Sequence, residues 1–135
     1  MDPEEKSKAK TVALIAHDRK KDAMARWVKD NSKMLSKHTL VSTKTTGSSL
    51  QAEIPDLALT TVASGPMGGD QQIGAMIVAG DIDLLIFFTD PLSPHPHDVD
   101  VKALTRLATV YDLPMACSEA TAHLILRSGY LDVPA

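Results

Sequence analysis

The stretch from Ser64 to Gly74, SGPMGGDQQIG, holds the residue types in this chain that are best suited to chemistry. Three glycines and a proline within its first six residues exclude a regular helix or strand there, whereas residues 70–78 have the apolar spacing of a helix. The bend therefore brings a helix N-terminus, with its amides and positive dipole end, to the Asp70 carboxylate, where a phosphate could be held. The alternative interpretation is that Asp70 is only an N-cap and the glycines only form a tight turn.

Polar segments of the same kind follow the other apolar runs of the chain. His17 and Asp18 follow the first run, residues 43–47 follow the second, and the proline- and histidine-rich residues 90–100 follow the fourth. The fifth run is followed by residues 118–121. Because the carboxyl ends of parallel strands meet at one edge of a sheet, we expect these segments to form one site.

Hydrogen-bond donors dominate this predicted site, and phosphate is the ligand that they fit best. The donors are the Lys21 ammonium, the hydroxyls of Thr43, Thr45, Thr46 and Ser64, and the amides of Gly47 and Gly65. Beside them the sequence places the carboxylates of Asp18, Asp70, Asp98 and Asp100 and the imidazoles of His17, His95 and His97. Carboxylates next to a phosphate are suited to moving protons.

The histidine-rich segment also permits a metal-site interpretation. His95, His97, Asp98 and Asp100 are close enough in sequence to bind a divalent ion, with His17 or Asp18 as a further ligand. The neighbouring prolines favour a stiff loop that fixes one imidazole, so we predict no metal. Neither G-x-G-x-x-G nor G-x-x-x-x-G-K-[ST] occurs, which argues against a dinucleotide or Walker-type nucleotide site.

Strand-like and helix-like segments alternate five times, which predicts an α/β three-layer sandwich with a five-stranded, mostly parallel, Rossmann-like sheet. The predicted strands are residues 11–16, 39–43, 57–63, 83–89 and 114–117. The predicted helices are residues 21–35, 47–53, 70–78, 99–111 and 119–127.

Composition limits the function classes further. With 135 residues, 44% of them hydrophobic, we expect a flexible tail over residues 1–10 and one domain over 11–135. The net charge of −3 argues against nucleic acid as a partner, and no apolar run is long enough for a membrane span. The single cysteine, Cys117, is expected to be a buried structural thiol and suits a reducing, cytoplasmic location.

The ordered motifs of this chain resemble the methylglyoxal synthase family from about Val12 to Leu126. The motifs are ALIAHD with Lys20 and Lys21, TKTTG at 43–47, SGPMGGDQQIGA at 64–75, FFTDPL at 87–92, PHDVDVKAL at 96–104 and ATA at 120–122. The resemblance implies conversion of dihydroxyacetone phosphate to methylglyoxal and inorganic phosphate without a cofactor, in a bypass of lower glycolysis. It also implies a homohexamer in the cytoplasm that is inhibited by phosphate.

The same resemblance implies roles for individual residues. Asp70 matches the catalytic base, His97 the group on the substrate oxygens, and Asp18 and Asp100 the supporting acids. The matched ligands of substrate and phosphate are His17, Lys21, Thr43, Thr45, Thr46, Ser64 and Gly65.

One departure falls inside the predicted phosphate loop, where Lys44 stands at a position that is glycine in the family. Lys44 could enter the pocket as an additional phosphate ligand, or it could face solvent. If the position needs a positive φ, a lysine there would strain the backbone. We favour the solvent-facing outcome.

An alternative function is a non-catalytic regulatory module, since the fold also resembles the allosteric domain of carbamoyl-phosphate synthetase. The presence of Asp18, Asp70, His97 and Asp100 favours the enzyme.

Overall fold

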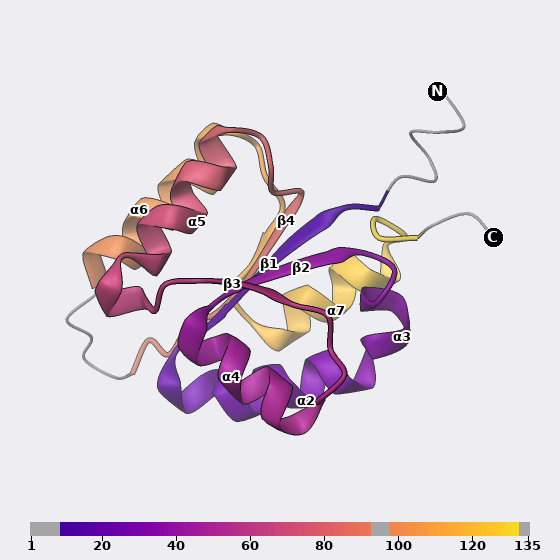
Figure 1. Cartoon of the computed structure of the whole chain (residues 1–135). Helices are drawn as coiled ribbons and strands as arrows, with labels where there is room; N and C mark the ends of the chain where they lie inside the picture. The colour runs from indigo at the N-terminus through magenta and orange to yellow at the C-terminus, as the bar shows by residue number, and fades with distance from the viewer. Residues whose placement is uncertain (1–8, 93–97, 133–135) are drawn as a thin grey trace.

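The computed structural model describes residues 9–92 and 98–132 and shows a sheet between two layers of helices (Figure 1). The strands are β1 (Thr11–Ala16), β2 (Thr39–Thr43), β3 (Thr60–Val62), β4 (Leu84–Phe88) and β5 (Met115–Ala116). They are ordered β3-β2-β1-β4-β5, and every neighbouring pair is parallel. The predicted fold class is therefore confirmed, with a sheet that is wholly parallel.

The α-helices of the described chain form two groups on opposite faces of the sheet (Figure 1). One face carries α2 (Lys21–Asp30), α3 (Ser32–Leu35), α4 (Lys44–Glu53) and α7 (Glu119–Arg127), and the other carries α5 (Gly69–Val78) and α6 (Asp98–Val110). Two short 3₁₀ turns, η1 (Asp18–Lys20) and η2 (Gly65–Met67), precede α2 and α5. The order of β1 between β2 and β4 puts the reversal of strand order at β1 and β4, the place where such sheets bind ligands.

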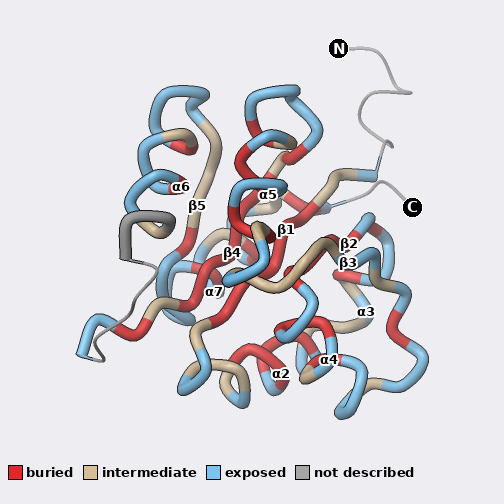
Figure 2. Tube along the Cα trace, turned by 60° about the vertical axis from the view of Figure 1, so that its left-hand side comes forward, coloured by how far each residue is buried: buried red, intermediate tan, exposed pale blue. Residues whose placement is uncertain are grey.

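Alternating side chains of the strands fill two separate hydrophobic clusters. Val12 and Leu14 of β1 pack with Trp27 of α2 on one face, whereas Ala13 and Ile15 pack with Ile73 of α5 on the other. All five residues of β4 are buried, and Figure 2 shows β1 and β4 as the buried centre of the molecule. These two strands are covered on both faces, as parallel sheets require.

Three predicted elements differ from the structure by an interruption or by three residues at a boundary, and the others agree to within one residue at each end. The helix predicted over residues 21–35 is broken at Asn31, whose backbone N–H at 3.1 Å and side-chain amide at 2.8 Å both donate to the Trp27 carbonyl. The helix predicted from Gly47 begins at Lys44 instead. The strand predicted over residues 57–63 is restricted to Thr60–Val62.

Gly47, predicted to begin a helix and to offer its amide to a phosphate, is buried inside α4, where it serves close packing. A Cβ atom at this position would lie 2.7 Å from Ser42 Oγ and 2.7 Å from Thr61 Cγ2, so only glycine lets α4 pack this closely on β2 and β3.

The first eight residues of the predicted N-terminal tail lie outside the described residues. Within the described residues, no helix is both long and apolar enough to cross a bilayer.

Candidate active site

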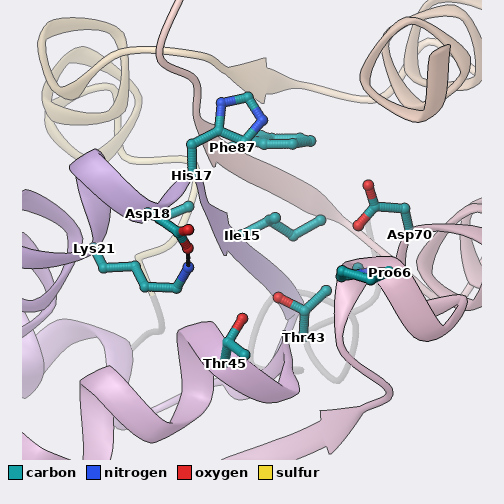
Figure 3. A pocket seen from close by; sticks show the side chains of 11 residues that line it. Ile15, His17, Asp18, Lys21, Thr43, Thr45, Pro66, Asp70 and Phe87 are labelled. Carbon is teal, nitrogen blue, oxygen red and sulfur yellow. Dashed lines mark hydrogen bonds and ion pairs between the residues drawn. The ribbon is translucent and has the colours of Figure 1, made fainter. Parts of the chain in front are cut away.

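A pocket of about 220 Å³ opens at the carboxyl edge of the sheet and brings together side chains from the ends of β1, β2 and β3 (Figure 3). Seven of the residues predicted for the site line it: His17, Asp18, Lys21, Thr43, Thr45, Gly65 and Asp70. Figure 3 places the Lys21 and Asp18 side chains on one side of the pocket and Asp70 on the other, with Thr43 and Thr45 between them. The pocket therefore has a carboxylate facing a set of donors.

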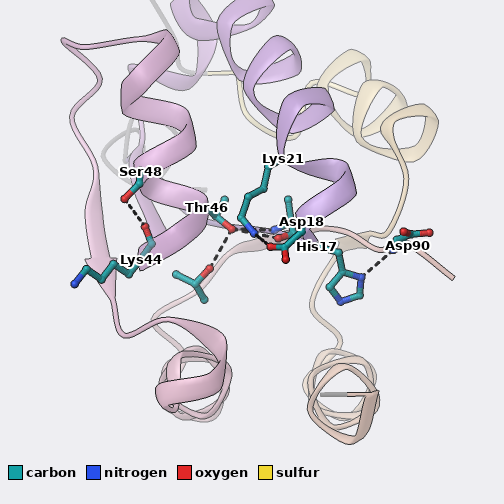
Figure 4. Close-up of polar contacts among 9 residues, drawn as sticks. His17, Asp18, Lys21, Lys44, Thr46, Ser48 and Asp90 are labelled. Atoms are coloured by element: carbon teal, nitrogen blue, oxygen red, sulfur yellow. Dashed lines mark hydrogen bonds and ion pairs between the residues drawn. The ribbon is translucent and has the colours of Figure 1, made fainter. Parts of the chain in front are cut away.

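His17 is held by contacts with β4. Its backbone N–H donates to the Phe88 carbonyl at 3.1 Å, and its Nδ1 accepts from the Asp90 N–H at 2.9 Å (Figure 4). The imidazole edge packs against the Phe87 ring, with centroids 5.2 Å apart and planes at 74°. These contacts fix the ring at the mouth of the pocket.

Lys21 supplies a cation whose position is set by an ion pair. Its Nζ pairs with a carboxylate oxygen of Asp18 three residues earlier, across the η1 turn. The Lys21 side chain is only 15% exposed, whereas that of Asp18 is 95% exposed. The ammonium is therefore partly removed from solvent, where its attraction for an anion is stronger than in bulk water.

The end of β2 and the start of α4 provide the hydroxyls. Thr43 is extended, with φ −68° and ψ 157°, and the helix begins at the next residue, so the amides of the first turn have no partner within the helix. Thr43 and Thr45 line the pocket, and Thr46 lies behind them with 1% of its surface exposed. An anion at this helix end meets both hydroxyls and the positive end of the helix dipole.

Lys44 is exposed, and its side chain points away from Lys21 and His17 (Figure 4). This agrees with the solvent-facing outcome. The condition for backbone strain at this position is not met, because among the described non-glycine residues only Asp112 has a positive φ. Lys44 is the first residue of a helix, where a side chain meets no steric penalty.

The loop between β3 and α5 places Asp70 in the pocket. Gly68 adopts a left-handed conformation with φ 99°, and a Cβ at Gly69 would lie only 1.9 Å from the Ala63 carbonyl oxygen. The Gln72 side chain accepts from the Ala63 N–H at 2.7 Å and ties the helix to the strand. Both glycines are therefore needed to fold the first turn of α5 back over β3.

Asp70 is 6% exposed and lines the pocket from inside the first turn of α5. The N-cap position is Gly68, so the interpretation of Asp70 as an N-cap is wrong. Ser64 begins the η2 turn, and its carbonyl accepts from the amides of Met67 and Gly69.

Several predicted site residues lie outside the described part of the chain. His95 and His97 belong to the segment 93–97, and only the backbone of Asp98 and Asp100, at the start of α6, is described. No group of three potential metal ligands occurs among the described residues.

Two residues differ from what the sequence suggested. Asp90 belongs to the predicted segment 90–100 but was given no role of its own, yet it is 6% exposed and its N–H donates to His17. Its position just after a wholly apolar strand is the signal that could have indicated this role. Cys117 is exposed, not buried, although partial burial raises the pKa of its thiol. It lines a different cavity, of about 370 Å³, with Lys20 and Ser118.

A wholly parallel sheet with donors and carboxylates at its carboxyl edge is the arrangement of α/β proteins whose ligand site lies at the ends of the strands. The family model described as MGS-like domain matches residues 23–117. Methylglyoxal synthase from Rhizobium rhizogenes is 60% identical over 119 residues, which are 88% of this chain and 94% of that protein. Methylglyoxal synthase from Agrobacterium fabrum is 57% identical over 90% of this chain and 95% of its own.

The crystal structure of methylglyoxal synthase from Elizabethkingia anophelis matches with a TM-score of 0.87 at 48% identity, covering 93% of this chain and 82% of that one. This chain belongs to the methylglyoxal synthase family.

Proposed function

We propose that this chain is a carbon–oxygen lyase that converts dihydroxyacetone phosphate to methylglyoxal and inorganic phosphate. The observation that carries the proposal is a pocket with the Asp70 carboxylate facing the donors Lys21, Thr43 and Thr45. Membership of the methylglyoxal synthase family supports the same reaction. The named relatives carry the name of an enzyme, which gives no support to a non-catalytic regulatory module.

The phosphate occupies the side of the pocket that is formed by β1, β2 and the start of α4. Lys21 contributes the positive charge, Thr45 a hydroxyl at the pocket surface, and the first turn of α4 its amides and dipole. Gly65, at the η2 turn, lines the same pocket, and we expect Ser64 just before it to bind the same ligand. Lys44, although beside these donors in sequence, faces solvent and takes no part.

The proton chemistry takes place on the opposite side. Asp70 is buried at the edge of the pocket and serves as the base. His17 and His97 bind the substrate oxygens and stabilise the negative charge that develops on the carbonyl oxygen. Asp18 and Asp100 are the supporting acids; Asp18 also sets the position of Lys21 through their ion pair.

Elementary chemistry fixes the order of bond changes. Asp70 takes a proton from the hydroxymethyl carbon beside the carbonyl, which gives an enediolate. The electron pair of the enediolate then expels phosphate from the other carbon as the C–O bond breaks. The enol aldehyde that remains gains a proton on its CH₂ carbon and loses the proton of its hydroxyl, which gives methylglyoxal. Isomerisation starts with the same proton transfer, so elimination depends on holding the C–O bond in line with the π system.

The test is incubation with dihydroxyacetone phosphate while methylglyoxal and free phosphate are followed separately. We expect the two products in equal amounts, with a rate that a chelator does not change. Glyceraldehyde 3-phosphate as the main product, or no turnover by folded protein, contradicts the proposal.

We further propose that the chain acts in the cytoplasm as a homohexamer and that its product phosphate inhibits it. The single cysteine suits a reducing compartment, and a pocket built around a phosphate binds free phosphate through the same donors. Light scattering after size exclusion tests the assembly, and inhibition that is competitive with substrate tests the second point. A monomer, or rates unaffected by phosphate, contradicts the respective statement.

A further inference from the structure

The Thr46 hydroxyl is buried behind the pocket and is engaged by three groups. Its Oγ1 accepts from the Ala16 N–H at 3.1 Å, receives the Thr43 hydroxyl at 3.1 Å, and donates to the Ala16 carbonyl at 3.4 Å. The residue is 1% exposed. Figure 4 shows Thr46 at the centre of these contacts, between α4 and the end of β1.

These contacts continue the β1–β2 ladder past the end of β2. The paired register ends at Leu14 with Ser42, but β1 runs on to Ala16 while β2 turns into α4. The Thr46 side chain meets both the N–H and the carbonyl of Ala16, groups that a further residue of β2 would have paired. The last residue of β1 before His17 is therefore fixed by a side chain.

The same hydroxyl governs the direction in which the Thr43 hydroxyl points. Thr43 lines the pocket, and its hydrogen is directed to Thr46. The Thr46 hydrogen has two acceptors in range, the Ala16 carbonyl and Thr43 Oγ1. Thr46 can therefore support Thr43 both when Thr43 donates inward and when it turns to donate to an anion.

We propose that the Thr46 hydroxyl is a positioning group for the anion pocket and is not itself a ligand of the phosphate. Its hydroxyl joins the end of β1, which carries His17 and Asp18, to the first turn of α4, which carries the phosphate donors. To touch an anion directly, the hydroxyl would have to leave partners that also need it, and a buried Ala16 N–H would lose its acceptor. The inference rests on the proposed function for its substrate, but it concerns phosphate binding that is measurable without turnover.

The experiment compares Thr46→Val, which keeps the shape and removes the hydroxyl, with Thr46→Ser, which keeps the hydroxyl. We expect Thr46→Val to raise both KM and the calorimetric Kd for inorganic phosphate about tenfold, with kcat lowered less. Thr46→Ser should stay within about twofold of the original protein in both quantities. If Thr46→Val does not accumulate as folded protein, Thr46→Cys, of similar volume and with a weak donor, takes its place with the same expectation.

Leu35→Val is the matched control for lost stability, because Leu35 is fully buried in α3, which leads into the opposite end of β2. We expect it to lower the melting temperature without changing the phosphate Kd. A double variant with Thr43→Val tests whether Thr46 acts through Thr43. The loss of phosphate affinity caused by Thr46→Val should be smaller when Thr43 has no hydroxyl. The proposal would be overturned if the losses of phosphate affinity in the double variant were fully additive, or if Thr46→Ser bound phosphate as weakly as Thr46→Val. Absence of synthase activity alone would contradict the proposed function but not this inference.

Discussion

The Nδ1 atom of His17 accepts a hydrogen bond from the backbone N–H of Asp90 at 2.9 Å. A ring nitrogen that accepts carries no proton, so the neutral imidazole keeps its hydrogen on Nε2. The contact joins the ends of β1 and β4, the two strands between which the order of the sheet reverses. Backbone geometry at this point therefore decides which nitrogen of His17 donates.

We expect His17→Gln to keep more activity than His17→Asn. Glutamine can place an N–H near the position of Nε2, whereas asparagine replaces only the Nδ1 acceptor that the Asp90 amide needs. Loss of one donor to a developing oxyanion costs on the order of 10²-fold in kcat, and His17→Asn should approach this value. Steady-state kinetics on both variants check the order; equal losses would mean that Nε2 does not contact the substrate.

Asp70→Asn should separate binding from chemistry. The amide has nearly the same shape but cannot take a proton, so kcat should fall on the order of 10²–10⁴-fold. Calorimetric titration with inorganic phosphate should give a Kd close to that of the original protein, because the donors are on the other side of the pocket. A variant that keeps more than half of kcat would rule out Asp70 as the base.

Gly69→Ala should unfold the protein much more easily than Gly80→Ala. At Gly69 the new Cβ would lie 1.9 Å from a backbone oxygen, whereas at Gly80 it meets nothing within 4 Å and only the positive φ of 80° is unfavourable. We expect a loss in the free energy of unfolding of more than about 3 kcal/mol at Gly69 and of about 1–2 kcal/mol at Gly80. Urea denaturation measures both, and similar losses would contradict the close approach of α5 to β3.

Replacement of Lys44 and of Lys21 should affect phosphate binding differently. Lys44→Ala should leave KM and phosphate inhibition nearly unchanged at low and high ionic strength, because its side chain faces solvent. Lys21→Met should weaken phosphate binding at least about tenfold, since it removes a partly buried charge from the pocket. A salt-sensitive rise in KM for Lys44→Ala would show that this lysine acts on the anion after all.

The alternation of apolar and polar segments was enough to predict the parallel sheet, because its central strands β1 and β4 are covered on both faces and almost wholly apolar, and polar loops follow their carboxyl ends. Element boundaries depend on single contacts that spacing does not reveal. The break after α2 falls at Asn31, which donates to the Trp27 carbonyl from both its backbone and its side chain. Gly47 lies inside α4 and packs on Ser42 and Thr61. The need for glycine there is a packing requirement that sequence spacing does not reveal.

The site was predictable to the level of which residues converge on the pocket. Lys21, Thr43 and Asp70 line it as their positions after strands suggested. The direction of a hydroxyl was not predictable, because Thr45 and Thr46 are adjacent in sequence yet one faces the pocket and the other the backbone of Ala16. Only the register of β1 against β2 makes that distinction.

The two separate hydrophobic clusters have a consequence for how this site can change. The base is carried by α5, which packs in one cluster, whereas Lys21 and Thr45 are carried by α2 and α4, which pack in the other. Substitutions at Ile77 or Leu104 would change the packing of α5, which carries the Asp70 carboxylate, and leave the positions of Lys21 and Thr45 unchanged. Reaction outcome and phosphate affinity are thus properties that selection, or a protein engineer, could adjust one at a time.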